Sequence, residues 1–395
     1  MNTVPLSSQV GGHAGVMTTE DGSLLIKPSL PVEVSFYQSV GTDPGFAPLR
    51  PFIPRFYGTL KLEGQVDNSE VVEGGEIKLT SINNGMNKDD IVLENISCRF
   101  HKPNILDIKL GTILYDDEAS PEKRARMEKT ARETTSLETG IRLTGFQVYH
   151  LESGVPINTP KTYGKSITPA DLPEGISRFF PVASPSPTPT KEDETPITGT
   201  GLPAKILLPI LQSLRQDIAD IRDALSQIHM RMVGGSLLVV YEADWERAEE
   251  GLKHLEEELE ELEAELEAEE DEDEDEDDEE EGKPKKVGMP YSVKLIDFAH
   301  TKIVPGEGPD EGVLKGVDTV LTLLDARIAQ YFCVQILLGP FNFYIPHKLE
   351  VASPDRHRRL VAIPSAQIPH CCLNYPCFAP LSPKTAPSVT GHNAL

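Results

Sequence analysis

The chain has 395 residues, five cysteines and a formal net charge of −26. This length suits one bilobal domain or two small domains, because single cores rarely grow beyond about 250–300 residues. No run reaches the roughly 18–20 apolar residues that a membrane span needs, and the first residues do not resemble a secretory signal. Four of the cysteines fall in the last 65 residues, so we exclude a disulfide framework and expect a reducing compartment.

The acidic charge is concentrated in one segment. Between Glu256 and Glu281 there are 21 Asp or Glu residues and no Lys or Arg, and removing them leaves a formal charge of −5. The remaining chain is only mildly acidic, so an anionic substrate is not excluded. Like charges repel one another along such a run, and the stretch Ala183–Thr200 is rich in Pro, Ser and Thr. We therefore predict flexible insertions at residues 183–203 and 252–289.

The N-terminal part of the chain predicts several strands and one helix. A glycine-rich loop, Gly11–Gly15, precedes the apolar run Ser23–Lys27, which is typical of a strand. The apolar spacing in Pro31–Val40 predicts a helix. Further strands are expected at Leu49–Glu63, Glu76–Leu79 and Asp89–Ile96.

The rest of the chain alternates strands and helices. The predicted strands are Pro103–Gly111, Ile141–Leu151, Gly234–Tyr241 and Tyr291–Phe298, and the predicted helices are Ser120–Gly140, Ala204–Val233, Leu252–Leu266 and Glu311–Gln330. The helix Ala204–Val233 carries an apolar stripe that suits either the domain core or a partner coiled coil, and we favour the core. From Tyr331 no period is sustained, so we expect residues 331–395 to form an irregular tail.

Lys27 is the first residue that suggests chemistry. A lysine that closes an apolar strand after a glycine-rich loop is where protein kinases keep the lysine that holds the ATP phosphates. Glu33, on the predicted helix that follows, is placed to pair with it. A solvated strand end is the alternative interpretation, because many strands end in lysine.

Asp107 and Lys109 lie two residues apart in a predicted strand, so both point to the same face. Phosphoryl transfer needs such a pair: a carboxylate that accepts the hydroxyl proton and a cation that stabilises charge on the transferred phosphate. The alternative interpretation is an ordinary ion pair between Asp107 and Lys109, which the same spacing would allow.

The segment Leu295–Phe298 is an apolar strand that ends in Asp–Phe, and Asp297 there resembles the magnesium-binding carboxylate of kinases. The predicted helix after the Asp-x-Lys strand is basic and suggests a polyanionic substrate. Its five cations are Lys123, Arg124, Arg126, Lys129 and Arg132. Helical spacing cannot place all five on one face, so some are solvated.

Two weaker patterns occur later in the chain. His370-Cys371-Cys372 with Cys377 lacks the paired spacing of structural zinc sites, so we assign no metal there. Lys283-Pro284-Lys285-Lys286 suits either a nuclear import signal or a solvated charge boundary.

Three motifs in order resemble the inositol polyphosphate kinase family. Pro103–Gly111 matches P-x-x-x-D-x-K-x-G, Gly235–Leu238 resembles the S-L-L motif, and Ile296–Thr301 resembles the I-D-F-A-H-T motif. Tyr115–Arg124 is similar to the multikinase branch, especially its fungal members. The resemblance covers roughly Gly11–Gln330 without the insertions. It implies an α+β, two-lobed kinase-like fold with an antiparallel-sheet N-lobe (residues 1–96), an α/β C-lobe (residues 97–330) and disordered insertions.

The resemblance also implies roles for individual residues and the cofactors ATP and Mg²⁺. Asp107 and Lys109 would be catalytic, and Asp297 would bind the metal. The implied ATP-binding residues are Lys27, Glu94, Ile96, Asp107, Ser236 and Asp297, with Glu94 and Ile96 as the hinge to adenine. The implied substrate-binding residues are Lys109, Lys123, Arg126, Lys161 and His300.

The implied activity is that of an ATP-dependent inositol polyphosphate multikinase, which phosphorylates inositol tris- and tetrakisphosphates towards the pentakisphosphate. One alternative is a kinase for another small molecule or for protein, although the chain lacks H-R-D-L-x-x-x-N and A-P-E. The other is an acidic nuclear scaffold that binds basic regulatory proteins. We expect a location in nucleus and cytoplasm, with no transmembrane segment and no direct nucleic-acid partner.

Overall fold

The structure is a computed structural model that describes residues 3–6, 15–60, 65–66, 79–80, 90–183, 199–269 and 288–338. Several predicted features lie wholly or mostly outside the described residues: the glycine-rich loop, the Pro/Ser/Thr-rich linker, the strand Glu76–Leu79, the second half of the acidic run, the Lys283–Lys286 cluster and the cysteines near His370. The chain divides into the unit Met1–Gly339 and the unit Pro340–Leu395, and the second also lies outside.

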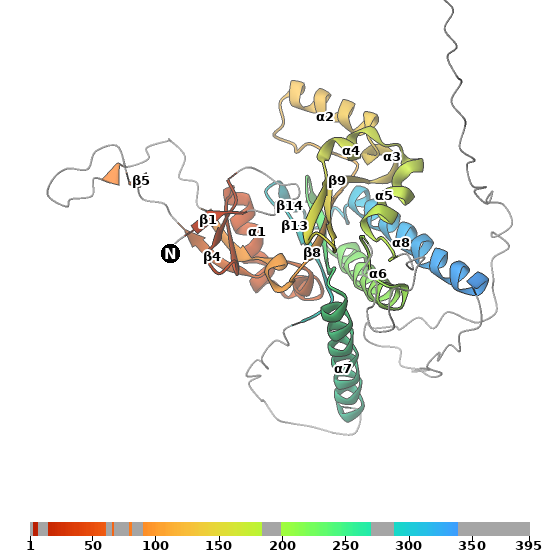
Figure 1. Ribbon diagram of the computed structural model, residues 1–395. Coiled ribbons are helices and arrows are strands. Elements are labelled where there is room, and N and C mark those ends of the chain that lie inside the picture. The colour runs from red at the N-terminus through yellow and green to blue at the C-terminus, as the bar shows by residue number, and fades with distance from the viewer. Residues whose placement is uncertain are drawn as a thin grey trace, which may run out of the picture. The chain divides into compact units, whose positions relative to one another are not determined.

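The first sheet is antiparallel and has the order β1-β2-β3-β7-β4. Its strands are β1 (Thr3–Pro5), β2 (Met17–Thr19), β3 (Leu24–Pro28), β7 (Asp90–Glu94) and β4 (Phe56–Leu60). Helix α1 (Pro31–Thr42) and the 3-10 segment η1 (Pro44–Phe52) follow β3 (Figure 1). Phe36 of α1 packs between Phe46 and Phe298, with ring centroids 5.7 and 4.2 Å away. These rings attach α1 to the segment that carries Asp297.

The second sheet is also antiparallel and has the order β10-β9-β8-β12-β13. Its strands are β10 (Val155–Thr159), β9 (Ile141–His150), β8 (Pro103–Leu110), β12 (Ser236–Glu242) and β13 (Tyr291–Ile296). Two small antiparallel pairs accompany these sheets: β11 (Met230–Met232) with β14 (Thr301–Ile303), and β5 (Gln65–Val66) with β6 (Leu79–Thr80). Antiparallel sheets with helices confirm the predicted α+β class.

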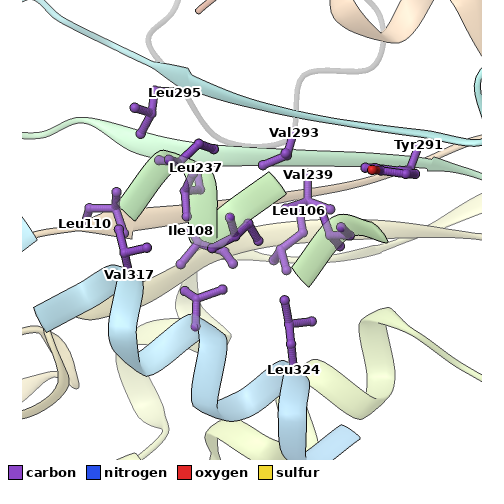
Figure 2. Packing of buried hydrophobic residues seen from close by; sticks show 14 of the residues in the cluster. Leu106, Ile108, Leu110, Leu237, Val239, Tyr291, Val293, Leu295, Val317 and Leu324 are labelled. Carbon is purple, nitrogen blue, oxygen red and sulfur yellow. The ribbon is translucent and has the colours of Figure 1, made fainter. Parts of the chain in front are cut away.

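Alternation along β8 separates the core from the chemistry. Leu106, Ile108 and Leu110 are buried among apolar residues of β12, β13 and α8 (Glu311–Leu338), as Figure 2 shows. Asp107 and Lys109 fall between them and therefore face the other side of the sheet. Burial of the apolar side of β8 fixes its register, because a shift by one residue would move Asp107 into the core.

The helix α6 (Ala204–Gln227) confirms the predicted apolar stripe. Leu207, Leu211, Leu214, Ile218 and Ile221 are all buried in the main core. α6 packs on α8 and on β13, so the stripe is occupied within this chain. The favoured prediction of core packing is therefore correct for the described residues.

The remaining helices border the second sheet (Figure 1). They are α2 (Pro121–Glu133), α3 (Ser136–Thr139), α4 (Lys161–Ser166), α5 (Leu172–Phe179) and α7 (Trp245–Glu269), with 3-10 turns η2 (Ile96–Arg99) and η3 (Pro169–Asp171). In the described part of the chain, no helix combines the length and the apolar character that crossing a bilayer would require.

Five boundaries differ from the sequence prediction. The helix predicted over Leu252–Leu266 begins at Trp245 and runs to Glu269, so the predicted flexible insertion 252–289 is helical over its first part. The predicted helix over residues 120–140 is broken after Glu133, where the buried Thr135 hydroxyl donates to the Ile141 carbonyl and so competes with helical bonding. The helix from Ala204 ends at Gln227 because residues 230–232 pair with β14 instead. Residues 49–52 are 3-10, since Pro48 and Pro51 remove strand donors. Finally, α8 continues past Gln330 to Leu338, and Tyr331 on it is buried.

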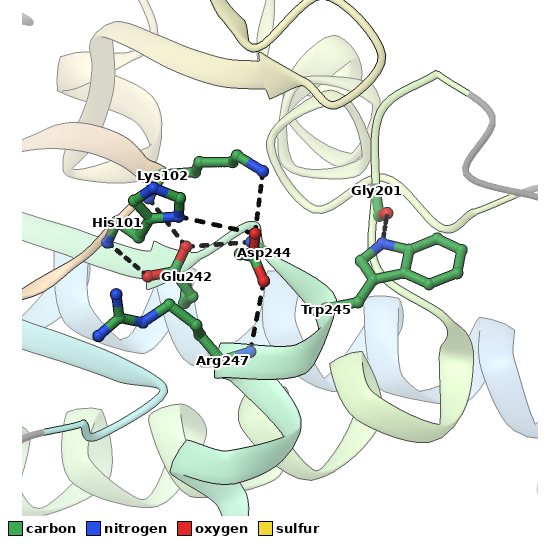
Figure 3. Close-up of polar contacts among 7 residues, drawn as sticks. All are labelled: His101, Lys102, Gly201, Glu242, Asp244, Trp245 and Arg247. Carbon is green, nitrogen blue, oxygen red and sulfur yellow. Dashed lines mark hydrogen bonds and ion pairs between the residues drawn. The ribbon is translucent and has the colours of Figure 1, made fainter. Parts of the chain in front are cut away.

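A buried carboxylate fixes the far end of β12 beside the start of β8 (Figure 3). Glu242 is 3% exposed and accepts hydrogen bonds from the backbone amides of His101 and Lys102, 2.7 and 2.9 Å away, and from that of Asp244. The Lys102 ammonium donates to Asp244 at 2.9 Å. These bonds satisfy a charge that would be costly to bury alone.

Candidate active site

Lys27 lies between two carboxylates. Its Nζ is 2.9 Å from Glu33 Oε1 and 2.9 Å from Asp297 Oδ1. The predicted pair of Lys27 and Glu33 is therefore present, and Asp297 joins it from a segment 270 residues away. Burial lowers the pKa of Lys27, but the charges of Asp297 and Glu33 outweigh burial, so the net pKa is raised and the ammonium stays charged.

Glu33 is one of the least exposed charged groups of the site, at 1%. Burial raises the pKa of Glu33, and the Lys27 ammonium opposes that rise. Tyr37, one turn further along α1, has a fully buried hydroxyl without a hydrogen-bond partner among the described residues. Burial raises the pKa of Tyr37, and the charges of Glu33 and Asp297 raise it further. These groups form a buried polar layer beneath Lys27.

Asp297 holds an uncommon backbone conformation. Its φ is 67°, and it is the only non-glycine residue with positive φ in the described part of the chain. Aspartate tolerates this left-handed region better than most residues, yet it still costs of order 1–2 kcal/mol. The conformation turns the chain sharply after β13, so that the Asp297 carboxylate meets Lys27 while Phe298 enters the core beside Phe36.

Asp107 is a buried carboxyl with a perturbed pKa. It is 3% exposed, and desolvation raises its pKa from 3.8 to about 6, against the lowering effects of Lys109, the Ser236 hydroxyl and Lys161. Its Oδ1 and the Ser236 Oγ are both buried and make no hydrogen bond of good geometry within the described residues. Buried polar atoms without partners are uncommon in folded proteins and indicate a place for a ligand.

Lys109 shares the face of Asp107, as the Asp-x-Lys spacing predicts. Its Nζ donates to the Gly234 carbonyl at 2.7 Å, and Lys109 lies opposite Ser236 in the pairing of β8 with β12. Gly111 follows with a φ of 98°, which favours glycine, and its amide donates to the Gly140 carbonyl at 2.8 Å. The motif thus ends in a turn that leads the chain from the sheet to α2.

An apolar surface continues the same face of the sheet. Ile105 and Val240 are buried with Ile96 in a small cluster separate from the main core, and Leu238 packs against it. Ile105 precedes Asp107 by two residues, so one face carries apolar groups at one end and Asp107 and Lys109 at the other. A ligand that joins a flat apolar ring to an anionic chain would fit this face, with its ring on the apolar groups and its chain toward the end that carries Asp107 and Lys109. The sequence prediction missed this surface, although the alternation along β8 contains the signal.

The two predicted hinge residues lie at the edge of this surface. Ile96 is 5% exposed and belongs to the small cluster. The Glu94 side chain is occupied elsewhere: it pairs with Arg99 and accepts from the Arg55 amide at 3.3 Å. Its side chain is therefore structural, and any contact of Glu94 with a nucleotide base would come from its main chain.

His300 and Lys123 are brought together by Asp116, which the sequence prediction did not include. The Asp116 Oδ2 is 2.7 Å from His300 Nδ1 and 3.7 Å from Lys123 Nζ. His300 follows Asp297 on the same loop, whereas Lys123 lies in the first turn of α2. The carboxylate thus links the basic helix to the loop that carries the predicted metal ligand.

The other cations of α2 have different surroundings. Arg124 donates to the carbonyls of Ala119 and Asp117, so it holds the loop before the helix and does not face a substrate. Lys129 and Arg132 pair with Glu133 and Glu128 on their own helix. Arg126 is exposed and makes no ion pair within the described residues. Lys123 and Arg126, the two predicted substrate cations of α2, lie three residues apart and therefore share one side of the helix.

Lys161 lies near the same site. It begins α4, and its charge lowers the pKa of Asp107, which shows that the two are electrostatically close. Gly164 allows α4 to touch β9, because a Cβ there would lie 1.6 Å from the Leu143 carbonyl oxygen. Any other residue at Gly164 would push α4 and Lys161 away from the sheet.

The residues fit a magnesium ion held mainly by a nucleotide. Within the described residues no group of three or more His, Cys, Asp or Glu side chains could hold a metal by itself. Mg²⁺ is usually bound by one or two carboxylates together with substrate phosphates and water. The Asp297 carboxylate beside Lys27, with the unpartnered Ser236 hydroxyl on the adjoining strand, is a donor set of this kind.

Comparisons with known proteins show to which family the chain belongs. Residues 90–325 match the family model "Inositol polyphosphate kinase". The chain is 34% identical over 361 residues to the inositol polyphosphate multikinase of Saccharomyces cerevisiae, which covers 80% of this chain and 96% of that protein. The corresponding protein of Schizosaccharomyces pombe is 33% identical over 172 residues, 44% of this chain and 61% of that protein.

A solved structure shows the same fold. The inositol phosphate multikinase Ipk2 of Saccharomyces cerevisiae, in complex with ADP and Mn²⁺, matches with a TM-score of 0.50 and 28% sequence identity, covering 78% of this chain and 100% of that chain. The family match spans more than half of the chain, and the first relative is matched over nearly its whole length. This chain therefore belongs to the inositol polyphosphate kinase family.

Proposed function

We propose that this protein is an ATP-dependent inositol polyphosphate multikinase that phosphorylates hydroxyls of inositol tris- and tetrakisphosphates towards the pentakisphosphate. The observation that carries the proposal is the convergence of Lys27, Asp297, Asp107 and Lys109 from three separate segments at one site. The family of the chain and the multikinase relatives support the choice of substrate.

The N-lobe, residues 1–96, would hold the nucleotide against the C-lobe, residues 97–330. The base would lie on the apolar surface of Ile105, Leu238 and Val240, with the main chain at Glu94 and Ile96 beside it. The Lys27 ammonium, kept charged by its two carboxylates, would bind phosphate oxygens. Bound Mg²⁺ at Asp297 would neutralise charge on the phosphates during transfer.

Asp107 would orient the attacking hydroxyl and accept its proton. A pKa of about 6 leaves Asp107 mostly ionised at pH 7, yet basic enough to take a proton as the oxygen–phosphorus bond forms. Lys109 lies on the same face and would hold the transferred phosphoryl group in line. Its bond to the Gly234 carbonyl fixes the ammonium before substrate arrives.

The substrate phosphates would bind on the basic side of the site. The cations that would hold them are Lys123 and Arg126 of α2, Lys161 of α4, whose charge lowers the pKa of Asp107, and His300, which shares Asp116 with Lys123. Fixed cations on several elements suit a small ring that carries several phosphates.

We also propose a location in nucleus and cytoplasm. The proposed protein partners are basic nuclear proteins that bind the acidic run.

The test is a comparison of acceptors in one assay. Purified protein is given Mg-ATP with inositol 1,4,5-trisphosphate, with a generic protein acceptor, or with no acceptor, and the products are separated by anion exchange. The proposal expects tetrakis- and pentakisphosphates and no phosphorylated protein. Phosphate transfer to the protein acceptor alone, from protein that binds ATP, would overturn it.

A further inference from the structure

A single carboxylate connects the two sides of the proposed substrate site. Asp116 is half-buried and lies between His300 of the loop after β13 and Lys123 of α2. The short 2.7 Å contact with His300 Nδ1 is a hydrogen bond by distance, whereas the 3.7 Å contact with Lys123 Nζ is a looser ion pair. The two contacts therefore have different strengths and different consequences.

The loop that carries Asp116 is itself held in place. Arg124 donates from Nε to the Ala119 carbonyl at 3.1 Å and from Nη2 to the Asp117 carbonyl, and its guanidinium lies over the Tyr115 ring. The Ala119 amide closes a turn onto the Asp116 carbonyl at 3.2 Å. The position of the Asp116 carboxylate is thus set by α2 before any substrate binds.

Contact at Nδ1 determines which way the histidine faces. An imidazole has two nitrogens, and the hydrogen bond at one decides the tautomer and the direction of the other. When Nδ1 carries the proton and donates it to Asp116 at this 2.7 Å separation, Nε2 is the nitrogen left to accept from a ligand. Because Lys123 is held only loosely, its ammonium can exchange the Asp116 carboxylate for an incoming phosphate at little cost in free energy.

We propose that Asp116 is a positioning residue for the inositol phosphate, acting through His300 and Lys123. The inference rests on the proposed function for its substrate, but the Asp116–His300 contact is a property of the protein alone. Asp116 presents Nε2 of the histidine to one substrate group and keeps the lysine nearby until a phosphate replaces the carboxylate as its partner.

The neighbouring residue gives a matched control. Asp117 lies on the same loop and pairs with Lys302, but its side chain is 78% exposed and contacts neither His300 nor Lys123 in the ion pairs of the structure. Removing any carboxylate here strengthens the general attraction of a polyanion. Asp117→Ala therefore measures the effect of charge, and Asp116→Ala adds the loss of positioning.

The kinetic test compares KM for inositol 1,4,5-trisphosphate with KM for ATP. Asp116→Ala should raise the KM for the trisphosphate by about tenfold, the scale of one charge-assisted hydrogen bond, with the KM for ATP unchanged. Asp116→Asn, which keeps an acceptor for Nδ1–H, should recover much of the loss. Asp117→Ala should leave both values within about twofold of the wild type. Equal effects of Asp116→Ala and Asp117→Ala would overturn the proposal.

A double-mutant cycle tests the route through the histidine. In a His300→Ala background, Asp116→Ala should change the KM for the trisphosphate much less than it does in the wild type, because its partner is absent. Full additivity of the two changes would contradict a role through His300.

A spectroscopic measurement tests the contact without any turnover. Imidazole ¹⁵N spectra at pH 8.5, with the His300 signals identified from His300→Gln, should show Nδ1 protonated in the wild type and Nε2 protonated in Asp116→Ala. Identical spectra in the two proteins would overturn the proposal. Wild-type protein that neither binds nor phosphorylates the trisphosphate would instead contradict the proposed function, whatever the tautomer.

Discussion

Replacing Asp107 by asparagine should stabilise the protein at pH 7 while abolishing phosphoryl transfer. The folded chain holds this carboxyl at a pKa of about 6, against 3.8 in the ordinary carboxyl, because burial disfavours its ionised form. One pKa unit corresponds to about 1.4 kcal/mol, so ionised Asp107 costs the folded state about 3 kcal/mol. Asparagine has nearly the same shape and carries no charge, so this cost disappears.

The pH dependence follows from the direction of the shift. The folded chain binds this proton more tightly than the unfolded chain, so stability falls as pH rises from about 4 to about 6. The full cost is present above about pH 6. The advantage of Asp107→Asn should therefore be about 3 kcal/mol at pH 7 and about 1.5 kcal/mol at pH 5.

The assay is urea unfolding at pH 7 and pH 5, with linear extrapolation to water. Asp171→Asn is the control, because a hydrogen bond from the Thr168 amide lowers the pKa of the exposed Asp171, which stays ionised over this range. The difference in unfolding free energy between Asp171→Asn and the wild type should be the same at pH 7 and pH 5. If Asp107→Asn is no more stable than the wild type at pH 7, or if its advantage does not shrink at pH 5, the reasoning is wrong.

Three further changes test other parts of the account. Asp297→Gly and Asp297→Ala should both be inactive, but the glycine variant should be more stable than the alanine variant by about 1–2 kcal/mol, since only glycine relieves the positive φ. Equal unfolding midpoints of the two variants would contradict backbone strain at Asp297. Glu33→Gln should raise the Kd for ATP by about tenfold while changing the unfolding free energy by less than about 1 kcal/mol, because Lys27 keeps Asp297 as an ion-pair partner. Calorimetry with ATP measures the affinity, and an unchanged affinity would refute the role of the Lys27–Glu33 pair. Tyr331→Ala should destabilise the protein by about 3 kcal/mol and Tyr331→Phe by about 1 kcal/mol, since the ring is buried and its hydroxyl donates to the Phe180 carbonyl at 3.3 Å. Urea unfolding curves of both variants that match the wild type would place Tyr331 outside the core.

Local periodicity was enough to predict the elements that carry the chemistry. Alternation along Pro103–Leu110 placed Asp107 and Lys109 on one face, and the end of the strand before Asp297 follows from its apolar run. The pairing of Lys27 with Glu33 also needed only the strand and the helix next to it. In each case the residues that decide the structure lie within a few positions of one another.

Features that depend on distant partners were missed. The helix from Ala204 stops at Gln227 because the residues after it pair with Thr301–Ile303, and no local signal contains that pairing. Asp116 lies in a loop and gains its importance only from His300, which lies far along the chain. Tyr331, on the continuation of α8, likewise has its hydroxyl partner far away in the chain, at the Phe180 carbonyl.

The central claim is that Asp107 transfers a proton within an inositol phosphate kinase site. The most direct measurement incubates wild type and Asp107→Asn with Mg-ATP and inositol 1,4,5-trisphosphate, with ATP binding to both proteins measured in parallel. The account predicts tetrakis- and pentakisphosphates from the wild type only, although both proteins bind ATP. Product formation by Asp107→Asn at the wild-type rate, or a folded, ATP-binding wild type that makes no product, would contradict it.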